Sequence, residues 1–240
     1  MKYRLFLLMT GLLMLGCQST PDTDQERTDD GVFADTQLTS NTAEGTDLVL
    51  TPKEKEKEMY ENTNRMVWQK PEMIIEMMGD LEGKVIADIG AGTGFFAKRL
   101  AQRAGKVIAI DIDQRFLNYI DSLKVLEISP EAASRLETRL AVPNHPNIKP
   151  GEADIILIVN TFMYIPNKKA YLKTLRECLA DEGRLFIIDF KKNRTEIGPP
   201  SEVRLPLYEI EELLYETGYE EIKANDTALD YQYIISGRKN

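Results

Sequence analysis

Cysteine and histidine are almost missing from this chain, which has two cysteines and one histidine in 240 residues. Cys17 and Cys178 are too few to build a disulfide framework. With His145 as the single histidine, the chain lacks the cluster of nitrogen and sulfur ligands that a usual zinc site needs, and no Ser-His-Asp arrangement stands out. His145 lies in a loop with prolines on both sides, so we interpret it as a surface residue. We therefore predict neither a metal site nor a triad-based active site.

Positive charge is also scarce. The chain has 30 Lys and Arg against 39 Asp and Glu, which gives a formal net charge of −9. No basic patch and no stripe of basic and aromatic residues occurs along it. Because nucleic-acid binding depends on Lys and Arg that neutralise phosphates, this composition excludes nucleic acid as the expected partner.

The apolar run at residues 5–15 is too short to span a bilayer, which needs about 20 residues. It follows Lys2 and Arg4, an arrangement typical of a secretory signal peptide. Residues 14–17, Met-Leu-Gly-Cys, resemble the lipobox of bacterial lipoproteins, in which the cysteine becomes the acylated mature N-terminus. The resemblance implies that residues 1–17 are a lipoprotein signal peptide and that Cys17 is lipidated.

This resemblance also implies an extracytoplasmic, lipid-anchored protein at the cell membrane or the outer membrane. The alternative is an uncleaved N-terminal anchor with the domain in the cytoplasm. Residues 18–51 are rich in Ser, Thr, Asp, Asn and Gln and have almost no aromatic residue, so we predict a disordered tether. Residues 52–240 are of the length expected for one domain.

One stretch, residues 85–94 (VIADIGAGTG), combines a strand pattern with a glycine turn. Its first half is the short apolar run of a parallel strand that is covered on both faces. Gly90, Gly92 and Gly94 then let the backbone turn tightly with no Cβ in the way. We expect a ligand to approach the backbone at this turn.

The spacing of these glycines differs from the dinucleotide fingerprint G-x-G-x-x-G, because the third glycine comes one residue early and Phe95 occupies the sixth position. Asp88 lies two residues before the first glycine. The next strand ends in Asp111, whose carboxylate can accept hydrogen bonds from ribose hydroxyls. Together these features resemble the class I S-adenosylmethionine-dependent methyltransferases, with residues 88–94 as their first motif and Asp111 as their ribose-binding acid. Residues 68–71, 154–157, 189–191 and 198–200 look like one subgroup of small bacterial methyltransferases.

The resemblance implies S-adenosyl-L-methionine as the cofactor and a set of cofactor-binding residues. They are Asp88, Gly90, Ala91, Gly92, Gly94, Asp111, Ile112, Asn144 and Asn160. In this set Ile112 would pack on an adenine face. The family often has an acid after the third strand that contacts the adenine amine, and here Asn144 would accept the same hydrogen bond without a charge.

The acceptor side is predicted from the position of the strand ends, because ligands of open α/β sheets bind beyond the carboxyl ends of the strands. Asn160, Tyr164 and Asp189 are the candidates for lining it, and no catalytic residue is assigned. Tyr164 has a competing interpretation as a core residue, and Asp189 as a plain polar strand end. Trp68 lies in the segment expected over the cofactor, and it also has a competing interpretation as a helix-packing aromatic.

The remaining pattern alternates strands with helices. We expect strands at 85–89, 107–111, 137–142, 153–159, 184–190, 219–224 and 231–236, and helices at 60–78 with a break near Pro71, 95–104, 114–125, 168–179 and 206–217. Such alternation implies a parallel sheet with right-handed crossovers, and the short last loop permits an antiparallel hairpin. The order resembles the class I methyltransferase sheet. We therefore predict an α/β fold with a Rossmann-like, doubly wound, seven-stranded, mostly parallel sheet and an antiparallel last strand.

Taken together, the sequence favours an S-adenosylmethionine-dependent methyltransferase, lipid-anchored, that acts on a small-molecule or lipid acceptor. Two alternatives remain open. A catalytically lapsed domain of the same fold would bind a ligand or a partner, which the missing acid near Asn144 leaves possible. The second alternative is an NAD-dependent oxidoreductase. The early third glycine argues against it, because it departs from the dinucleotide fingerprint.

Overall fold

The computed structural model describes residues 64–195 and 197–240. The expected signal peptide with Cys17, and the expected tether at residues 18–51, lie outside these residues. Within them no helix is both long and apolar enough to cross a membrane.

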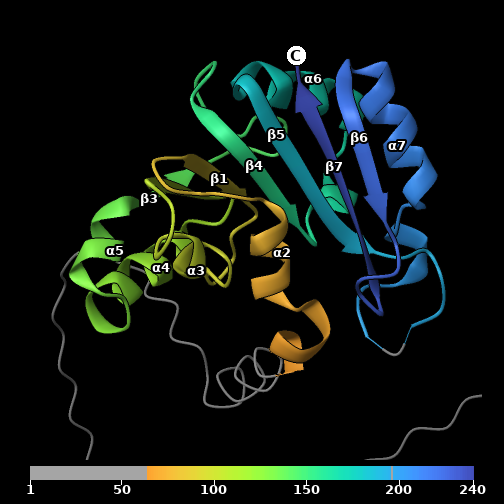
Figure 1. The fold of residues 1–240 in the computed structure, drawn as a ribbon. Coiled ribbons are helices and arrows are strands. Elements are labelled where there is room, and N and C mark those ends of the chain that lie inside the picture. The colour runs from red at the N-terminus through yellow and green to blue at the C-terminus, as the bar shows by residue number, and fades with distance from the viewer. Residues whose placement is uncertain (1–63, 196) are drawn as a thin grey trace, which may run out of the picture. The chain divides into compact units, whose positions relative to one another are not determined.

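Seven strands form one sheet in the order β3-β2-β1-β4-β5-β7-β6 (Figure 1). They are β1 (Val85–Ile89), β2 (Lys106–Asp111), β3 (Leu136–Leu140), β4 (Ala153–Val159), β5 (Leu179–Phe190), β6 (Tyr219–Asn225) and β7 (Gln232–Lys239). β1 runs parallel to β2 and β4, and β7 runs antiparallel to both of its neighbours, β5 and β6. The predicted fold class is thus confirmed, including the antiparallel last strand.

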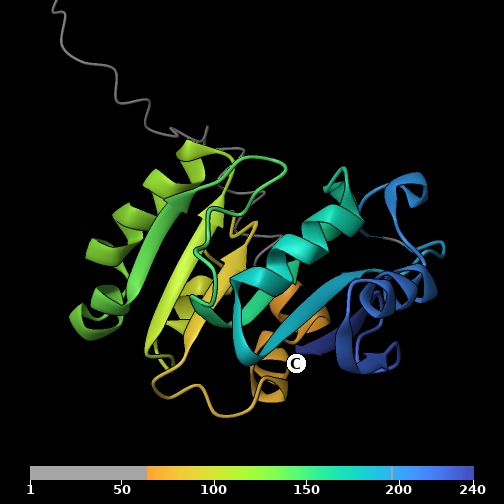
Figure 2. The ribbon, with the colours of Figure 1, turned by 90° about the horizontal axis from the view of Figure 1, so that it is seen from above.

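Helices cover both faces of this sheet (Figures 1 and 2). On one face lie α2 (Pro71–Met77), α3 (Ala97–Leu100), α4 (Gln114–Leu126) and α5 (Pro130–Arg135), and on the other α6 (Lys168–Cys178) and α7 (Leu207–Glu216). Side chains of successive strand residues pack into the cores on opposite faces of the sheet, as those of Ile86 and Ala87 do. Burial on both faces explains why the central strands have continuous apolar runs.

The first helical segment is interrupted as predicted. Residues 64–69 are helical, Lys70 takes a left-handed conformation with φ of 47°, and α2 begins at Pro71. A proline disfavours helical geometry in the residue before it, which accounts for the break. The short helix α5 was not predicted, although Ser129 caps it by accepting a hydrogen bond from the Ala132 amide at 3.3 Å.

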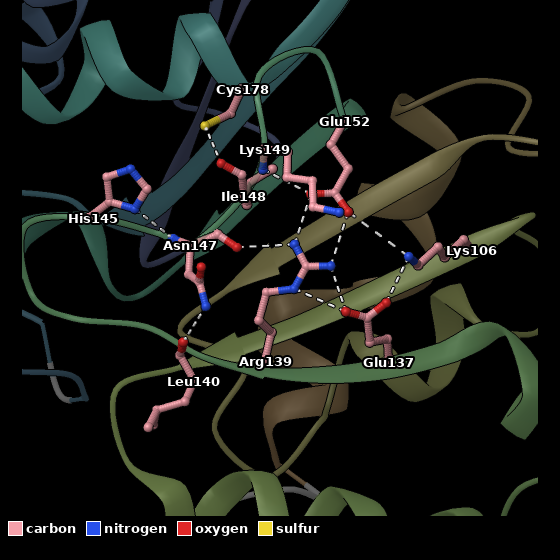
Figure 3. A network of polar contacts seen from close by, with 10 residues as sticks. All are labelled: Lys106, Glu137, Arg139, Leu140, His145, Asn147, Ile148, Lys149, Glu152 and Cys178. Carbon is pink, nitrogen blue, oxygen red and sulfur yellow. Dashed lines mark hydrogen bonds and ion pairs between the residues drawn. The ribbon is translucent and has the colours of Figure 1, made fainter.

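An ion-pair network fastens the edge strand β3 to the sheet (Figure 3). Arg139 on β3 pairs with Glu152 just before β4 through two bonds of 2.8 and 3.0 Å. The same guanidinium contacts Glu137 and donates to the Asn147 carbonyl at 3.0 Å. The network therefore holds the loop that follows β3, and this loop forms one wall of the cavity described below.

We expect Glu152→Gln to lower the free energy of unfolding by about 1.5–3 kcal/mol at pH 7, the size of a charge-assisted hydrogen bond. The hydrogen bonds from Arg139 lower the pKa of Glu152 from its ordinary 4.5 to about 2. A lowered pKa means that this stability is present above pH 4.5 and is lost as the pH falls toward 2. Urea unfolding at pH 7 and pH 3 should show the gap to wild type shrinking, with exposed Glu212→Gln as the control. A gap equal at both pH values would contradict the assignment.

Candidate functional site

The carboxyl ends of β1, β2 and β4 surround two adjoining cavities. The larger has a volume of about 500 Å³ and reaches from the end of β2 to the turn after β4. The smaller has about 170 Å³ and lies between the glycine turn and the helical residues 64–69. Gly90, Gly92 and Thr161 line both cavities. The two therefore meet at the glycine turn, where the sequence predicts a ligand.

The larger cavity has mainly apolar walls with carboxylates at one edge. Ile112 and Val142 stand at its rim and expose 60% and 55% of their surface. Tyr164 also lines the cavity and is 60% exposed, so the interpretation of Tyr164 as a core residue is wrong. Apolar walls with a few directed polar groups suit a flat ring system that carries hydroxyls.

Asp111 fastens the glycine turn to the end of β2. Its Oδ2 accepts a hydrogen bond from the Gly92 amide at 2.9 Å, and its Oδ1 accepts one from the Asp113 amide at 3.0 Å. Because each carboxylate oxygen can accept more than one hydrogen bond, both keep acceptor capacity. Asp111 lines the larger cavity, so this capacity is available to a ligand there.

The three glycines of the turn differ in what a side chain at each position would contact. A Cβ on Gly90 would lie 2.1 Å from Thr161 Oγ1, so the turn packs on the segment after β4 only without a side chain at this position. A Cβ on Gly94 would lie 3.0 Å from Ile120, and Gly94 lines neither cavity. At Gly92, where φ is 51°, a Cβ would meet no protein atom within 4 Å. Gly92 is therefore open to the cavities themselves.

The smaller cavity brings a carboxyl and a guanidinium together. Asp88 is only 2% exposed, and its Oδ2 has no hydrogen-bond partner among the described residues. Burial raises the pKa of Asp88 to about 7, although the charge of Arg65 acts in the opposite direction. Arg65 lies over the Phe95 ring, 4.3 Å from its centroid, and lines the same cavity. The cavity thus offers complementary partners to a group that carries both an amine and a carboxylate.

Arg65 was not among the predicted site residues, nor was Thr161. Arg65 precedes the glycine turn by a whole helix–loop segment, and no local motif marks it. The available signal was its place four residues before Gln69, on the same face of the helix that the sequence set over the cofactor. Of the predicted cofactor residues, Ala91 and Asn160 also line the smaller cavity.

Asp189 lies behind the turn after β4 rather than in either cavity. It is fully buried, and its Oδ2 accepts a hydrogen bond from the Met163 amide at 3.0 Å. Burial raises the pKa of Asp189 to about 8. This placement does not match the predicted acceptor-side role, because the carboxyl is engaged in holding the turn that carries Asn160 and Tyr164.

Asn144 lies outside the lining of both cavities. It is exposed, whereas Val142 and Pro143 just before it contribute to the larger cavity. Trp68 packs on Phe190 and Tyr231 with ring centroids 5.6 and 6.4 Å away, which confirms its interpretation as a packing aromatic.

His145 is exposed, as predicted, and Cys178 is buried. Over residues 64–195 and 197–240, no three His, Cys, Asp or Glu side chains form a group that could hold a metal ion.

Sequence comparisons show that this chain is similar to methyltransferases. Residues 87–185 match the family model for a methyltransferase domain. Two curated relatives are ubiquinone biosynthesis O-methyltransferases: that of Aeromonas salmonicida is 26% identical over 132 residues and that of Acinetobacter baylyi 26% over 133. In each case the match covers 55% of this chain and 52% of the relative, so the chain spans about half the length of the curated relatives it matches.

Solved structures share the fold. A SAM-dependent methyltransferase from Aquifex aeolicus superposes with a TM-score of 0.68 at 22% identity, covering 78% of this chain and 98% of its own. A phosphoethanolamine N-methyltransferase from Haemonchus contortus, solved with S-adenosylhomocysteine, gives 0.59 at 15% identity, covering 72% and 52%. Over residues 87–185 the chain is therefore similar to a methyltransferase domain, and its fold is that of solved S-adenosylmethionine-dependent methyltransferases.

Proposed function

We propose that this domain binds S-adenosylmethionine and transfers its methyl group to a small-molecule or lipid acceptor. The observation that carries the proposal is the two-part cavity around Gly92. Its larger part offers apolar walls beside Asp111, which suits adenosine. Its smaller part is lined by both Arg65 and Asp88, which suits the amino-acid end of the same molecule. The match of residues 87–185 to the methyltransferase-domain family supports this assignment.

Each end of the cofactor then has identifiable partners. Asp111 accepts hydrogen bonds from the ribose hydroxyls, and Ile112 and Val142 pack on the adenine. The buried carboxyl of Asp88 accepts from the amine, and Arg65 faces the carboxylate. With these pairings, Oδ2 of Asp88 gains a hydrogen-bond partner, and the charged amine and carboxylate of the ligand each face a complementary group.

The sulfonium of the cofactor supplies its own leaving group, so the chain mainly contributes proximity and alignment. The turn after β4 is central to this task, because it carries Asn160 to the smaller cavity and Tyr164 to the rim of the larger one. Asp189 keeps this turn in place from inside the protein. Tyr164 is the exposed side chain that we assign to the acceptor side.

The test is to purify the protein under native conditions, denature it and search the released small molecules by mass spectrometry. We expect S-adenosylmethionine or S-adenosylhomocysteine in amounts comparable with the protein. Release of NAD instead would overturn the proposal in favour of an oxidoreductase. Bound cofactor without methyl transfer to any quinol, catechol or lipid acceptor would identify a lapsed binding domain.

We propose further that the mature protein is anchored through an acylated Cys17. The basic start of the chain, its short apolar run and the Gly-Cys pair at residues 16–17 support this. An exported enzyme would need methyl donor outside the cytoplasm, where the donor is not made, so the compartment bears directly on activity.

We expect Cys17→Ser to accumulate as unprocessed precursor that incorporates no labelled fatty acid, whereas the wild type is labelled and fractionates with membranes. The physical reason is that the lipid is attached through the cysteine sulfur, which a serine hydroxyl does not replace. An unlabelled wild type whose domain resists external protease in intact spheroplasts would place the domain in the cytoplasm.

A further inference from the structure

Four polar side chains form a continuous chain of hydrogen bonds from the first helical segment to the end of β4. Arg65 Nε donates to Gln69 Oε1, and Gln69 Nε2 donates to Gln232 Oε1 at 3.0 Å. Gln232 Nε2 in turn donates to Asn160 Oδ1. The two glutamines come from segments 163 residues apart in the sequence and are both fully buried.

The two ends of this relay lie in the smaller cavity, and its two central members do not. Arg65 and Asn160 line the cavity, whereas Gln69 and Gln232 line neither of the cavities around the glycine turn. Gln232 is the first residue of β7, which is not adjacent to β1 or β4 in the sheet. Any effect of Gln232 on a ligand must therefore pass through the residues at the ends.

Arginine gives the relay a direction. A guanidinium has only donors, so Gln69 must turn its oxygen toward Arg65 and its amide nitrogen toward Gln232. The same constraint passes along Gln232 to Asn160, whose oxygen is engaged and whose Nδ2 is left as the outermost donor. Both ends of the relay therefore present hydrogen-bond donors, one of them cationic, from residues that line the smaller cavity.

Burying two amide side chains costs free energy unless their hydrogen bonds are made, and a pair of apolar side chains would fill the space without that cost. Asn160 itself is held at φ of 56°, a left-handed conformation that is uncommon outside glycine and in which asparagine is enriched. The buried pair thus accompanies a residue with an uncommon backbone conformation that lines the smaller cavity. This combination is typical of side chains kept for geometry rather than for packing alone.

We propose that Gln69 and Gln232 are positioning residues that hold Arg65 and Asn160 as two donors toward the carboxylate of the cofactor's amino-acid end. This inference rests on the proposed function, and it names the recognition element that separates ligands with an amino-acid end from those without one. Gln232 acts through Asn160, and Gln69 acts through Arg65. The relay is then selective for the amino-acid end and indifferent to the adenosine.

Titration calorimetry with two ligands tests this directly. S-adenosylhomocysteine has the amino-acid end, and 5′-methylthioadenosine lacks it while keeping the thioether and the adenosine. We expect Gln232→Met, which is similar in size and removes both hydrogen bonds, to weaken S-adenosylhomocysteine binding by about 10-fold or more. Binding of 5′-methylthioadenosine should change by less than about 2-fold.

Tyr233→Phe is the matched control. Tyr233 is the next residue on β7, belongs to the core under α6 and α7, and donates a partly buried hydrogen bond to the Leu205 carbonyl at 3.2 Å. Removal of the Tyr233 hydroxyl should change the affinity for each of the two ligands only slightly and to the same extent. Should Gln232→Met fail to fold by circular dichroism, Gln232→Glu replaces it. Its ionised carboxylate still accepts from Gln69 and has no N–H to donate to Asn160, and its negative charge also opposes a ligand carboxylate.

Equal weakening of the two ligands by the Gln232 variants would overturn the inference, since it would show that the residue serves packing alone. Unchanged binding of S-adenosylhomocysteine would overturn it as well. If the wild-type protein binds neither ligand, the proposed function is rejected. If the wild type binds both, the Gln232 variants test the positioning role separately from the proposed function.

Discussion

Gly92→Val should abolish binding of S-adenosylhomocysteine, with a loss of affinity of at least about 100-fold, or about 2.7 kcal/mol. Position 92 lies where the two cavities meet, and a side chain there enters space that no protein atom occupies within 4 Å of the added Cβ. The ligand and the new methyl groups would therefore compete for the same volume. Calorimetric titration of the purified variant measures the loss.

The control is Gly151→Val, because Gly151 has a comparable positive φ of 68° and equally open space around its Cβ but lies outside both cavities. Both substitutions strain the backbone, so the melting temperatures of the two variants should fall together. Only the Gly92 variant should lose ligand. If valine at 92 lowers stability too far, Gly92→Ala repeats the test with less strain. Normal binding by a folded variant would show that the ligand does not lie on this turn.

Asp111→Ala should weaken ligand binding by about 1.5–3 kcal/mol, or roughly 10- to 150-fold. The substitution removes the acceptor for the ribose hydroxyls and also the carboxylate that binds the Gly92 amide at 2.9 Å. Both consequences concern the adenosine half of the ligand. S-adenosylhomocysteine and 5′-methylthioadenosine should therefore weaken alike, in contrast to the selective effect expected at Gln232.

The folded domain should survive the Asp111 substitution, because the residue ends β2 and is only half-buried. Asp111→Asn offers a graded comparison, since the amide keeps one acceptor oxygen and should recover part of the affinity. Calorimetry of the three proteins at one ionic strength gives the order. Undiminished affinity in a folded Asp111→Ala protein would remove this carboxylate from the site.

The sheet was predictable because local patterns determine it. The continuous apolar runs of β1, β2 and β4 reflect burial on two faces, and the short loop before β7 sets the antiparallel pairing. The same holds for part of the site, since Gly92 and Asp111 follow directly from strand ends. Boundaries were less predictable, as the early start of β5 at Leu179 shows.

The rest of the site depends on contacts between distant segments. Gln232 reaches Asn160 only because β7 inserts between β5 and β6, and no pattern around Gln232 records that neighbour. Asp189 lies one residue before the end of β5, yet the turn after β4 folds over it and buries it. Asn144 misses the cavity because the loop presents residues slightly earlier in the chain.

The most direct test of the central claim is titration calorimetry of the wild-type protein with S-adenosylmethionine and, separately, with NAD. The two-part cavity, with Asp111 in one part and both Arg65 and Asp88 in the other, predicts saturable binding of one S-adenosylmethionine per chain. It predicts no measurable binding of NAD at the same concentration. Binding of NAD in the absence of any S-adenosylmethionine binding would contradict the account.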